Sequence, residues 1–206
     1  MMRYLLLSSC LAILLGCASA YKHLQPATGD VRNLQQFKPE FSVALYKAGV
    51  DVAGNHLGGL LLIKKMPDSS TRLVFSNEIG FKFFDFEFAK DGKFKVFSIM
   101  KQMDKKAVIK TLRKDFELVM MEGINDPGVL IRKDSGLVYY SYKQSKGYYH
   151  YITNKAGGEL IRMERASKRK PVMEAIMRNY KNGIPDTIGI THKNFNFTIG
   201  LKHIKR

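Results

Sequence analysis

The residue types that most often carry chemistry are few in this sequence, and their spacing does not suit catalysis. No pair of histidines stands in a His-Glu-x-x-His pattern or in another spacing typical of metal ligands. A Gly-x-Ser-x-Gly nucleophile motif, a phosphate-binding loop and a dinucleotide fingerprint are also missing from the sequence. The residues therefore predict a protein that is not an enzyme and that uses no metal or other cofactor. The histidines are His23, His56, His150, His192 and His203.

Asp85 and Glu87 come nearest to a catalytic pair of carboxylates. They alternate along a strand-like segment, so both side chains would lie on one face of it. Such a pair could perform general acid–base chemistry. Pairing with Lys82 or Lys95 would instead make them part of a solvated surface, and this simpler interpretation is favoured.

The N-terminus has the pattern of an export signal. Arg3 precedes an apolar run over residues 5–15, which is shorter than the roughly 20 residues that a membrane span needs. The two cysteines, Cys10 and Cys17, lie within and just after this run. The domain that follows therefore has no cysteine for a disulfide or a Cys-based metal site.

The run ends in Leu14-Leu15-Gly16-Cys17, which resembles the lipobox of bacterial lipoproteins. That resemblance implies a signal peptide over residues 1–16, acylation of the Cys17 thiol and a lipid-anchored mature chain in the cell envelope. Ala18 is not aspartate, which by the enterobacterial sorting rule implies the outer membrane, with the domain facing the periplasm. The alternative is an ordinary secretory signal that is cleaved after Ala18 or Ala20.

The charge is strongly positive, with 34 Lys and Arg against 18 Asp and Glu and a formal net charge of +16. Such a surface attracts anionic head groups, acidic proteins or nucleic acid, and the export signal argues against nucleic acid. The densest basic cluster could contact phosphate head groups, or it could be a solvated loop. It comprises Arg162, Arg165, Lys168, Arg169 and Lys170.

Beyond a polar tether over residues 17–29, the sequence predicts a single mainly β domain over 30–206. Short runs of Val, Ile, Phe and Tyr alternate with polar residues and are separated by Gly, Asn, Asp and Pro, which is typical of antiparallel strands. The predicted strands are 41–48, 57–65, 71–76, 82–89, 94–102, 137–143, 148–154, 159–165, 171–180, 187–192 and 195–203.

One helix interrupts the strands, with Asp104 as its expected N-cap and Gly123 beyond its end. Its apolar stripe would fill the concave side of a strongly curved sheet, giving an incomplete β-barrel with a helix in its hollow. Such a sheet can enclose an apolar ligand, and flexible methionines suit an adaptable cavity. Ordinary core packing is the alternative role for the same residues. The candidates for an acyl-chain cavity are Ile109, Leu112, Phe116, Phe84, Phe86, Phe88, Met173 and Met177.

Three segments make the chain resemble the LolA/LolB family of lipoprotein carriers and receptors, and the receptor LolB most closely. Asp30-Val31-Arg32-Asn33-Leu34-Gln35-Gln36-Phe37 is similar to a helix end before the first long strand of that family. Residues 72–80 are similar to a strand and loop that ends in Ser/Thr-Asn-x-Leu-Gly, although Glu78 stands where the family usually has proline. Residues 184–188 and 195–204 are similar to its closing hairpin.

The resemblance implies an incomplete antiparallel barrel that binds the acyl chains of lipoproteins and helps insert them into the outer membrane. It also implies a periplasmic carrier of LolA type as partner. Ile79 occupies the position of a protruding leucine that acts in membrane insertion, unless it folds back onto its own sheet. A different function remains open, in which the sheet is the scaffold of an envelope adaptor whose basic face binds an acidic protein, a polymer or anionic lipid.

Overall fold

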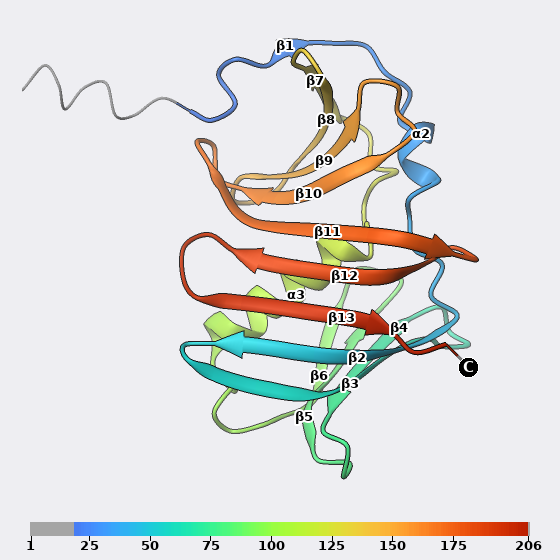
Figure 1. The fold of residues 1–206 in the computed structure, drawn as a ribbon, viewed down its shortest axis with the longest axis vertical. Coiled ribbons are helices and arrows are strands. Elements are labelled where there is room, and N and C mark those ends of the chain that lie inside the picture. Colours follow the sequence, from blue (N-terminus) through green and yellow to red (C-terminus); the bar gives the residue numbers. More distant parts are fainter. Residues whose placement is uncertain (1–18, 206) are drawn as a thin grey trace, which may run out of the picture.

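A computed structural model describes residues 19–205, which build one 13-stranded sheet around a single long helix (Figure 1). Every neighbouring pair of strands is antiparallel. The helices are α2 (Arg32–Gln35) and α3 (Lys106–Val119). The strands are β1 (Gln25–Pro26), β2 (Val43–Val52), β3 (Asn55–Lys65), β4 (Thr71–Ser76), β5 (Lys82–Phe88), β6 (Phe94–Ile99), β7 (Leu130–Lys133), β8 (Leu137–Lys143), β9 (Tyr148–Asn154), β10 (Leu160–Ala166), β11 (Pro171–Lys181), β12 (Ile184–His192) and β13 (Phe197–His203).

Two meanders share the sheet, and one seam joins them. Strands β7 to β13 follow one another on one side, and β2 to β6 follow one another on the other. The seam is the pairing of β13 with β2, in which Ile199 lies opposite Val50 and Leu201 opposite Ala48. Within residues 19–205, β1 and β6 stand at the two ends of the strand order and do not pair, so the sheet is open. The predicted fold class, a mainly β incomplete barrel with a helix in its hollow, is confirmed.

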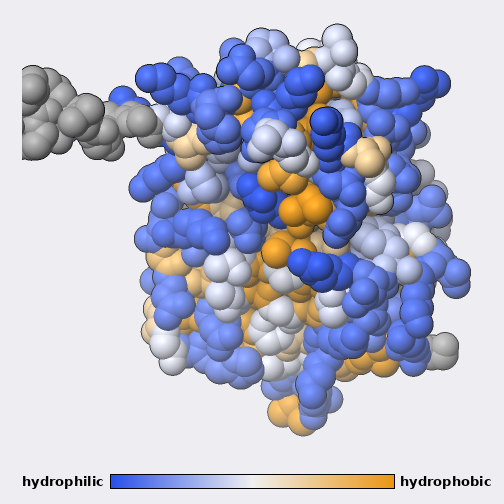
Figure 2. Space-filling model, turned by 45° about the horizontal axis from the view of Figure 1, so that its top comes forward, coloured by the Kyte–Doolittle hydropathy of each residue, from blue (hydrophilic) through white to orange (hydrophobic). Residues whose placement is uncertain are grey.

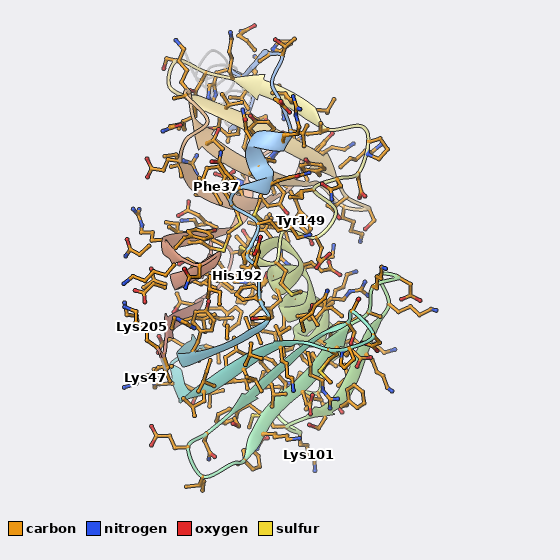
Figure 3. All side chains as sticks on the ribbon, turned by 90° about the vertical axis from the view of Figure 1, so that its right-hand side faces the viewer. Phe37, Lys47, Lys101, Tyr149, His192 and Lys205 are labelled. Carbon is orange, nitrogen blue, oxygen red and sulfur yellow. The ribbon has the colours of Figure 1, made fainter. Side chains whose placement is uncertain are left out.

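The hydrophobic core lies between α3 and the concave face of the sheet. Alternation in the strands places the large side chains there: Tyr46, Ile63 and Phe86 are fully buried. The helix contributes Leu112 and Phe116, which stand one turn apart on one face and are buried. Figure 3 shows the helix enclosed on this side of the sheet, with the labelled Tyr149 and His192 beside it.

Helix α3 begins differently from the prediction. Lys105 is its N-cap and provides no side-chain hydrogen bond, so Asp104 does not cap the helix. The end agrees better, because Met121 and Gly123 both adopt positive φ angles shortly after Val119. Packing of one apolar face, rather than a capping side chain, therefore defines this helix.

The first described residues pack on the opposite face of the sheet. Tyr21 and Leu24 are buried in a small second cluster with Tyr139, Ile152 and Ala166. Gln25–Pro26 then pair with β7 as the short strand β1. The segment expected as a tether thus contacts the sheet through the buried Tyr21 and Leu24 and through the pairing of Gln25–Pro26. Cys17 lies outside the described residues. In the described part of the chain, we find no helix that is long and apolar enough to cross a membrane.

Candidate functional site

A cavity of about 540 Å³ lies between α3 and the seam of the sheet, and we call it the hollow. Its volume is within the roughly 300–1,000 Å³ that is usual for small-molecule sites. Its walls are almost entirely apolar. The described residues that line it are Ala48, Val50, Val52, Ala53, Asn55, Leu57, Leu61, Phe75, Phe84, Met100, Gln102, Met103, Lys105, Val108, Leu112, Phe116, Phe197, Ile199 and Leu201.

Two periodicities of the sequence build these walls. In β13 every second residue, Phe197, Ile199 and Leu201, points into the hollow. On the helix, Val108 and Leu112 stand four residues apart, and Phe116 continues the same face. The hollow is therefore the place where a strand stripe and a helix stripe face each other without filling the space between them.

The polar residues of the lining are Asn55, Gln102 and Lys105, and all three are exposed to solvent. Asn55 begins β3, and Gln102 and Lys105 belong to the segment before α3, so this end of the hollow opens to water. Lys105 is the only ionisable residue among the described lining residues. The arrangement can bind an apolar chain, with a polar group left at the open end.

The predicted cavity residues divide into three groups. Phe84, Leu112 and Phe116 line the hollow. Phe86, Phe88, Met173 and Met177 are buried in the core but do not belong to the lining. Ile109 is partly buried and does not line the hollow either. Met100 and Met103, two of the flexible methionines that the sequence offered for an adaptable cavity, also line the hollow. Sequence reasoning missed Val108 and the β13 stripe, although the alternation of β13 was a signal that could have found the stripe.

Ile79 stands at the tip of the turn over residues 77–80, and 90% of it is exposed. Asn77 closes this turn: its backbone N–H donates to the Phe81 carbonyl at 2.9 Å, and its Oδ1 accepts the Phe81 N–H at 2.8 Å. Gly80 supplies a positive φ of 89°. Phe81 beside it is 52% exposed. Ile79 therefore points to solvent and does not fold back onto its sheet.

Gly59 positions this turn. A Cβ atom at Gly59 would lie 2.1 Å from the Ser76 carbonyl oxygen and 3.1 Å from Asn77 Cα. Those atoms are backbone and cannot rotate away. Because Gly59 has no side chain, the backbone at the end of β4 can lie very close to β3. This close approach sets the position of the loop that carries Ile79.

The predicted basic cluster is divided by the sheet. Arg162 donates to Glu164 Oε1 at 2.8 Å, and Glu164 also accepts the Tyr21 hydroxyl at 2.6 Å on the face away from α3. Arg165 points the other way and lies 3.2 Å from Asp115 of the helix. Lys168, Arg169 and Lys170 form the exposed turn between β10 and β11. Hydrophilic side chains likewise cover most of the face seen in Figure 2.

Asp115 anchors the helix through buried charges. Its Oδ2 lies 2.7 Å from Nε2 of His192, and both side chains are almost completely buried. Burial raises the pKa of the Asp115 carboxyl, and His192 and Arg165 oppose that shift. Nδ1 of His192 has no hydrogen-bond partner in the described structure. These residues join β10, β12 and α3 but do not face the hollow.

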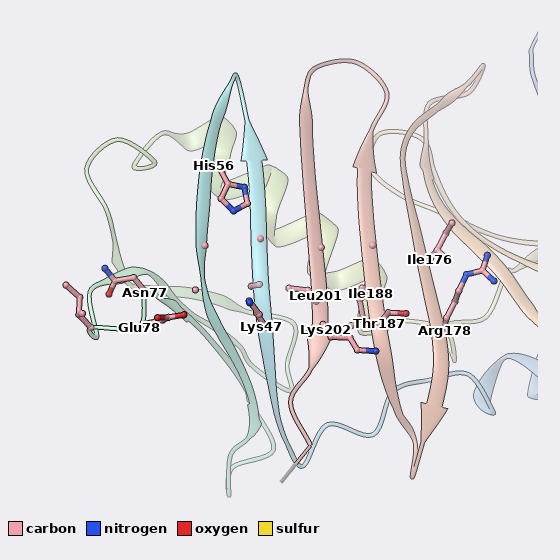
Figure 4. A pocket seen from close by; sticks show the side chains of 17 residues that line it. Lys47, His56, Asn77, Glu78, Ile176, Arg178, Thr187, Ile188, Leu201 and Lys202 are labelled. Carbon is pink, nitrogen blue, oxygen red and sulfur yellow. The ribbon is translucent and has the colours of Figure 1, made fainter.

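A larger cavity of about 1,020 Å³ lies on the convex face, and Figure 4 shows its residues. Its floor is a row of four glycines in register across β12, β13, β2 and β3. A Cβ atom added at Gly189 or Gly200 would meet nothing within 4 Å, so this is a shallow surface with few walls. Its rim is cationic and includes Lys47, Arg178 and Lys202. The enclosed hollow is the better ligand site.

The Asp85–Glu87 pair is not a solvated pair of carboxylates. Asp85 is only 2% exposed, and it accepts hydrogen bonds from Arg72 at 2.7 Å and from Lys82 at 3.1 Å. These hydrogen bonds outweigh the effect of burial and lower the pKa of Asp85. The predicted pairing with Lys82 is present, but the expected solvation of Asp85 is wrong because Arg72 and its contact with the Phe97 ring cover the carboxylate.

The histidines are scattered over the described structure. His150 is buried against Ser141, and His56 pairs with Asp51 at the surface. No group of three or more His, Cys, Asp and Glu residues within 19–205 could hold a metal ion.

Comparisons with known proteins give a structural likeness only. No family model matches the sequence, and no curated protein matches it. The LolA superfamily protein from Nitrosomonas europaea superposes with a TM-score of 0.50 at 9% identity, over 87% of this chain and 93% of that chain. A DUF1329 family protein from Desulfovibrio piger gives a TM-score of 0.45 at 10% identity, over 85% of this chain and 88% of that chain. The chain therefore has a LolA-like fold, which confirms the resemblance at the level of the fold and does not single out LolB.

Proposed function

We propose that this protein is an outer-membrane lipoprotein that takes the acyl chains of other lipoproteins into the hollow and helps insert them into the membrane. The observation that supports the proposal is the hollow itself, an apolar cavity of about 540 Å³ with one end open to water. A lipoprotein has the matching chemistry, since its acyl chains are apolar and the protein that follows them must stay in solvent.

Burial of methylene groups is the proposed driving force. Each methylene that leaves water for an apolar site contributes about 0.8 kcal/mol. About ten buried methylenes would contribute on the order of 8 kcal/mol before the loss of chain freedom is subtracted. That gain does not need a nucleotide, so transfer would run from a carrier of LolA type with weaker contacts to this protein with stronger ones.

Release into the membrane is assigned in this proposal to the loop that carries Ile79. A side chain that is 90% exposed contributes little to the fold, and a neighbouring half-exposed Phe81 enlarges the apolar tip. The lipid anchor at Cys17 would hold the domain at the membrane that receives the cargo. The basic surface would meet an acidic carrier or anionic head groups.

The decisive experiment compares lipoprotein binding by the parent domain with binding by a variant whose hollow is filled by a larger side chain. A chain that begins at Ala18, and so contains every described residue but no lipid, is incubated with a purified triacylated lipoprotein and examined by native mass spectrometry. We expect a one-to-one complex that requires the acyl chains. Val108→Trp, which places an indole in the hollow, should reduce complex formation at least tenfold.

The matched control is Ile109→Trp, one residue along the same helix and outside the lining. It should bind like the parent, and circular dichroism should show that both variants fold. Equal binding by both variants, or no complex with the acylated protein, would refute the proposal and favour an adaptor that uses only its outer surface.

A further inference from the structure

A second, smaller cavity of about 310 Å³ lies where three hairpin turns meet the side of α3, and we call it the cationic pocket. Its lining includes Lys114 of the helix, Lys146 of the β8–β9 turn, Arg165 at the end of β10 and Lys168 of the β10–β11 turn. The β12–β13 turn closes the pocket with Asn194 and Phe195. No acidic residue belongs to the described lining.

The three lysines of the cationic pocket are not neutralised. Within residues 19–205, Lys114, Lys146 and Lys168 form no ion pair, whereas Arg165 is paired with Asp115 below the floor. Burial lowers the pKa of the Lys114 ammonium, and the charges of Lys110 and Arg165 lower it further, while the charge of Glu117 opposes the shift. Like charges held together in a partly enclosed site favour the binding of an anion.

Fixed neighbours hold the walls of the pocket in place. A Cβ atom at Gly147 would lie 1.9 Å from the Ala166 carbonyl, so the β8–β9 turn sits directly against the end of β10. Ser167 Oγ accepts the backbone N–H groups of Arg169 and Lys170, which closes the β10–β11 turn. His192 lines the floor, and its buried Nδ1 lacks a partner in the described structure. The pocket is thus built by the fold rather than by mobile surface chains alone.

The N-terminal segment connects the cationic pocket to the proposed anchor. Ser19 Oγ donates to the Lys168 carbonyl at 3.1 Å, and the Ala20 N–H donates to the Arg169 carbonyl at 2.7 Å. Ser19 follows Cys17 by two residues, and two residues span at most about 7 Å. In Figure 1 the β10–β11 and β12–β13 turns lie on the left, the side on which the coloured ribbon of the described chain begins. A lipid on Cys17 would bring this pocket to the level of the phosphate groups of the membrane.

We propose that the cationic pocket binds the phosphate group of an anionic lipid headgroup and so fixes how the domain stands on the membrane that holds its anchor. The pocket has room for a phosphate group, whose negative charge complements the three lysines that form no ion pair in the described structure. Phe195, 50% exposed at the rim, would touch the first methylenes of that lipid. The inference rests on the proposed anchor at Cys17 and is separate from cargo binding in the hollow.

The test uses the full chain purified in a neutral detergent and titrated by calorimetry with dihexanoyl phosphatidic acid, dihexanoyl phosphatidylcholine and inorganic phosphate. We expect binding of the phosphatidic acid and at least tenfold weaker binding of the zwitterionic lipid. The double variant Lys146→Gln/Lys168→Gln should weaken phosphatidic acid binding at least tenfold. The matched control Lys90→Gln/Lys101→Gln removes the same charge from exposed lysines outside the pocket and should bind like the parent.

A third variant separates the two sites. Val108→Trp fills the hollow and should leave phosphatidic acid binding unchanged. If this variant abolishes binding, the probe enters the hollow and the assignment is wrong. Equal losses of phosphatidic acid binding in both lysine pairs would also overturn it. So would binding of inorganic phosphate together with no binding of phosphatidic acid, since the pocket would then be a site for a free anion. Lipoprotein binding is measured separately by native mass spectrometry. A defect in the cationic pocket should therefore reduce only phosphatidic acid binding, and a defect in the hollow should reduce only lipoprotein binding.

Discussion

The carboxylate of Asp115 lies 2.7 Å from Nε2 of His192, and this contact fastens helix α3 to strand β12. The two residues are 77 positions apart in the sequence and are both buried. Arg165 of β10 reaches the other carboxylate oxygen at 3.2 Å. One helical side chain therefore ties the wall of the hollow to two strands of the sheet.

Removal of that carboxylate should destabilise the protein strongly. Asp115→Asn keeps the shape of the side chain but leaves Arg165 without its buried counter-charge, and a broken buried ion pair typically costs about 3–5 kcal/mol. We expect the free energy of unfolding in urea to fall by about 3 kcal/mol. Asp30→Asn, at an exposed pair with Arg32, should change it far less, because solvent screens that pair. Similar values for both variants would show that the buried pair does not hold the helix.

His150 should make the protein sensitive to mild acid. Burial lowers the pKa of His150 to about 4, below its ordinary value of 6.5. In the unfolded chain the imidazole takes up a proton as the pH falls through 6.5, while in the folded chain it stays neutral until about pH 4. Stability is therefore lost over that interval, by about 2 kcal/mol at pH 5 relative to pH 8 for this group alone.

His150→Gln removes this proton uptake and should reduce the loss between pH 8 and pH 5 by about that amount, as measured by urea unfolding at each pH. His56→Gln is the control, because His56 lies at the surface beside Asp51. If both variants lose stability with acid as the parent does, His150 is not the group responsible.

Gly59→Ala should displace the loop that carries Ile79. The new methyl group would meet the Ser76 carbonyl oxygen at 2.1 Å, and backbone must move to accept it. We expect a loss of about 1–3 kcal/mol in unfolding free energy and changed amide shifts across residues 76–80 in NMR spectra. Gly58→Ala is a direct comparison, since its Cβ meets only His56 Nε2, at 3.7 Å. Unchanged shifts in Gly59→Ala would contradict the proposed positioning role.

Ile79→Glu should separate cargo binding from cargo release. Because Ile79 is 90% exposed, the change should alter stability by no more than about 0.5 kcal/mol. The complex with an acylated protein should persist in native mass spectra, while transfer of that protein to liposomes should fall at least tenfold. Leu130→Glu provides the control at another exposed apolar residue, 51% exposed on β7. Transfer at the parental rate by Ile79→Glu would remove Ile79 from the release step.

Much of the fold follows from short-range patterns. Strands β4, β8 and β9 match their predicted bounds to the residue, because alternation and turn residues define them locally. Strand β7 was missed because its four residues, Leu-Ile-Arg-Lys, have no clean alternation, and its place is set by β8 beside it. Strand β1 has two residues, one of them proline, and exists only through its pairing with β7.

The candidate site was predictable in part for the same reason. The helical stripe identified Leu112 and Phe116, and both line the hollow. Phe84 and Phe86 share one strand face and stack at 4.4 Å, yet only Phe84 reaches the hollow. Alternation along a strand shows which face of the sheet a side chain lies on. It does not show at which residues of the strand α3 packs against that face. The cationic pocket also depends on three turns that are distant in sequence, so its lysines could not be grouped from their spacing.

The seam between β13 and β2 has a consequence for the order in which the molecule can assemble. Across it, Thr198 donates to Asp51 Oδ2, and these residues are 147 positions apart in the chain. Strand pairings between residues so far apart in sequence form slowly, because the conformational entropy of a large loop must be lost before any contact stabilises the pair. The hollow takes its walls from both sides of this seam. The cavity is therefore complete only after β13 has paired with β2, so binding of a ligand in the hollow must follow the closing of the seam.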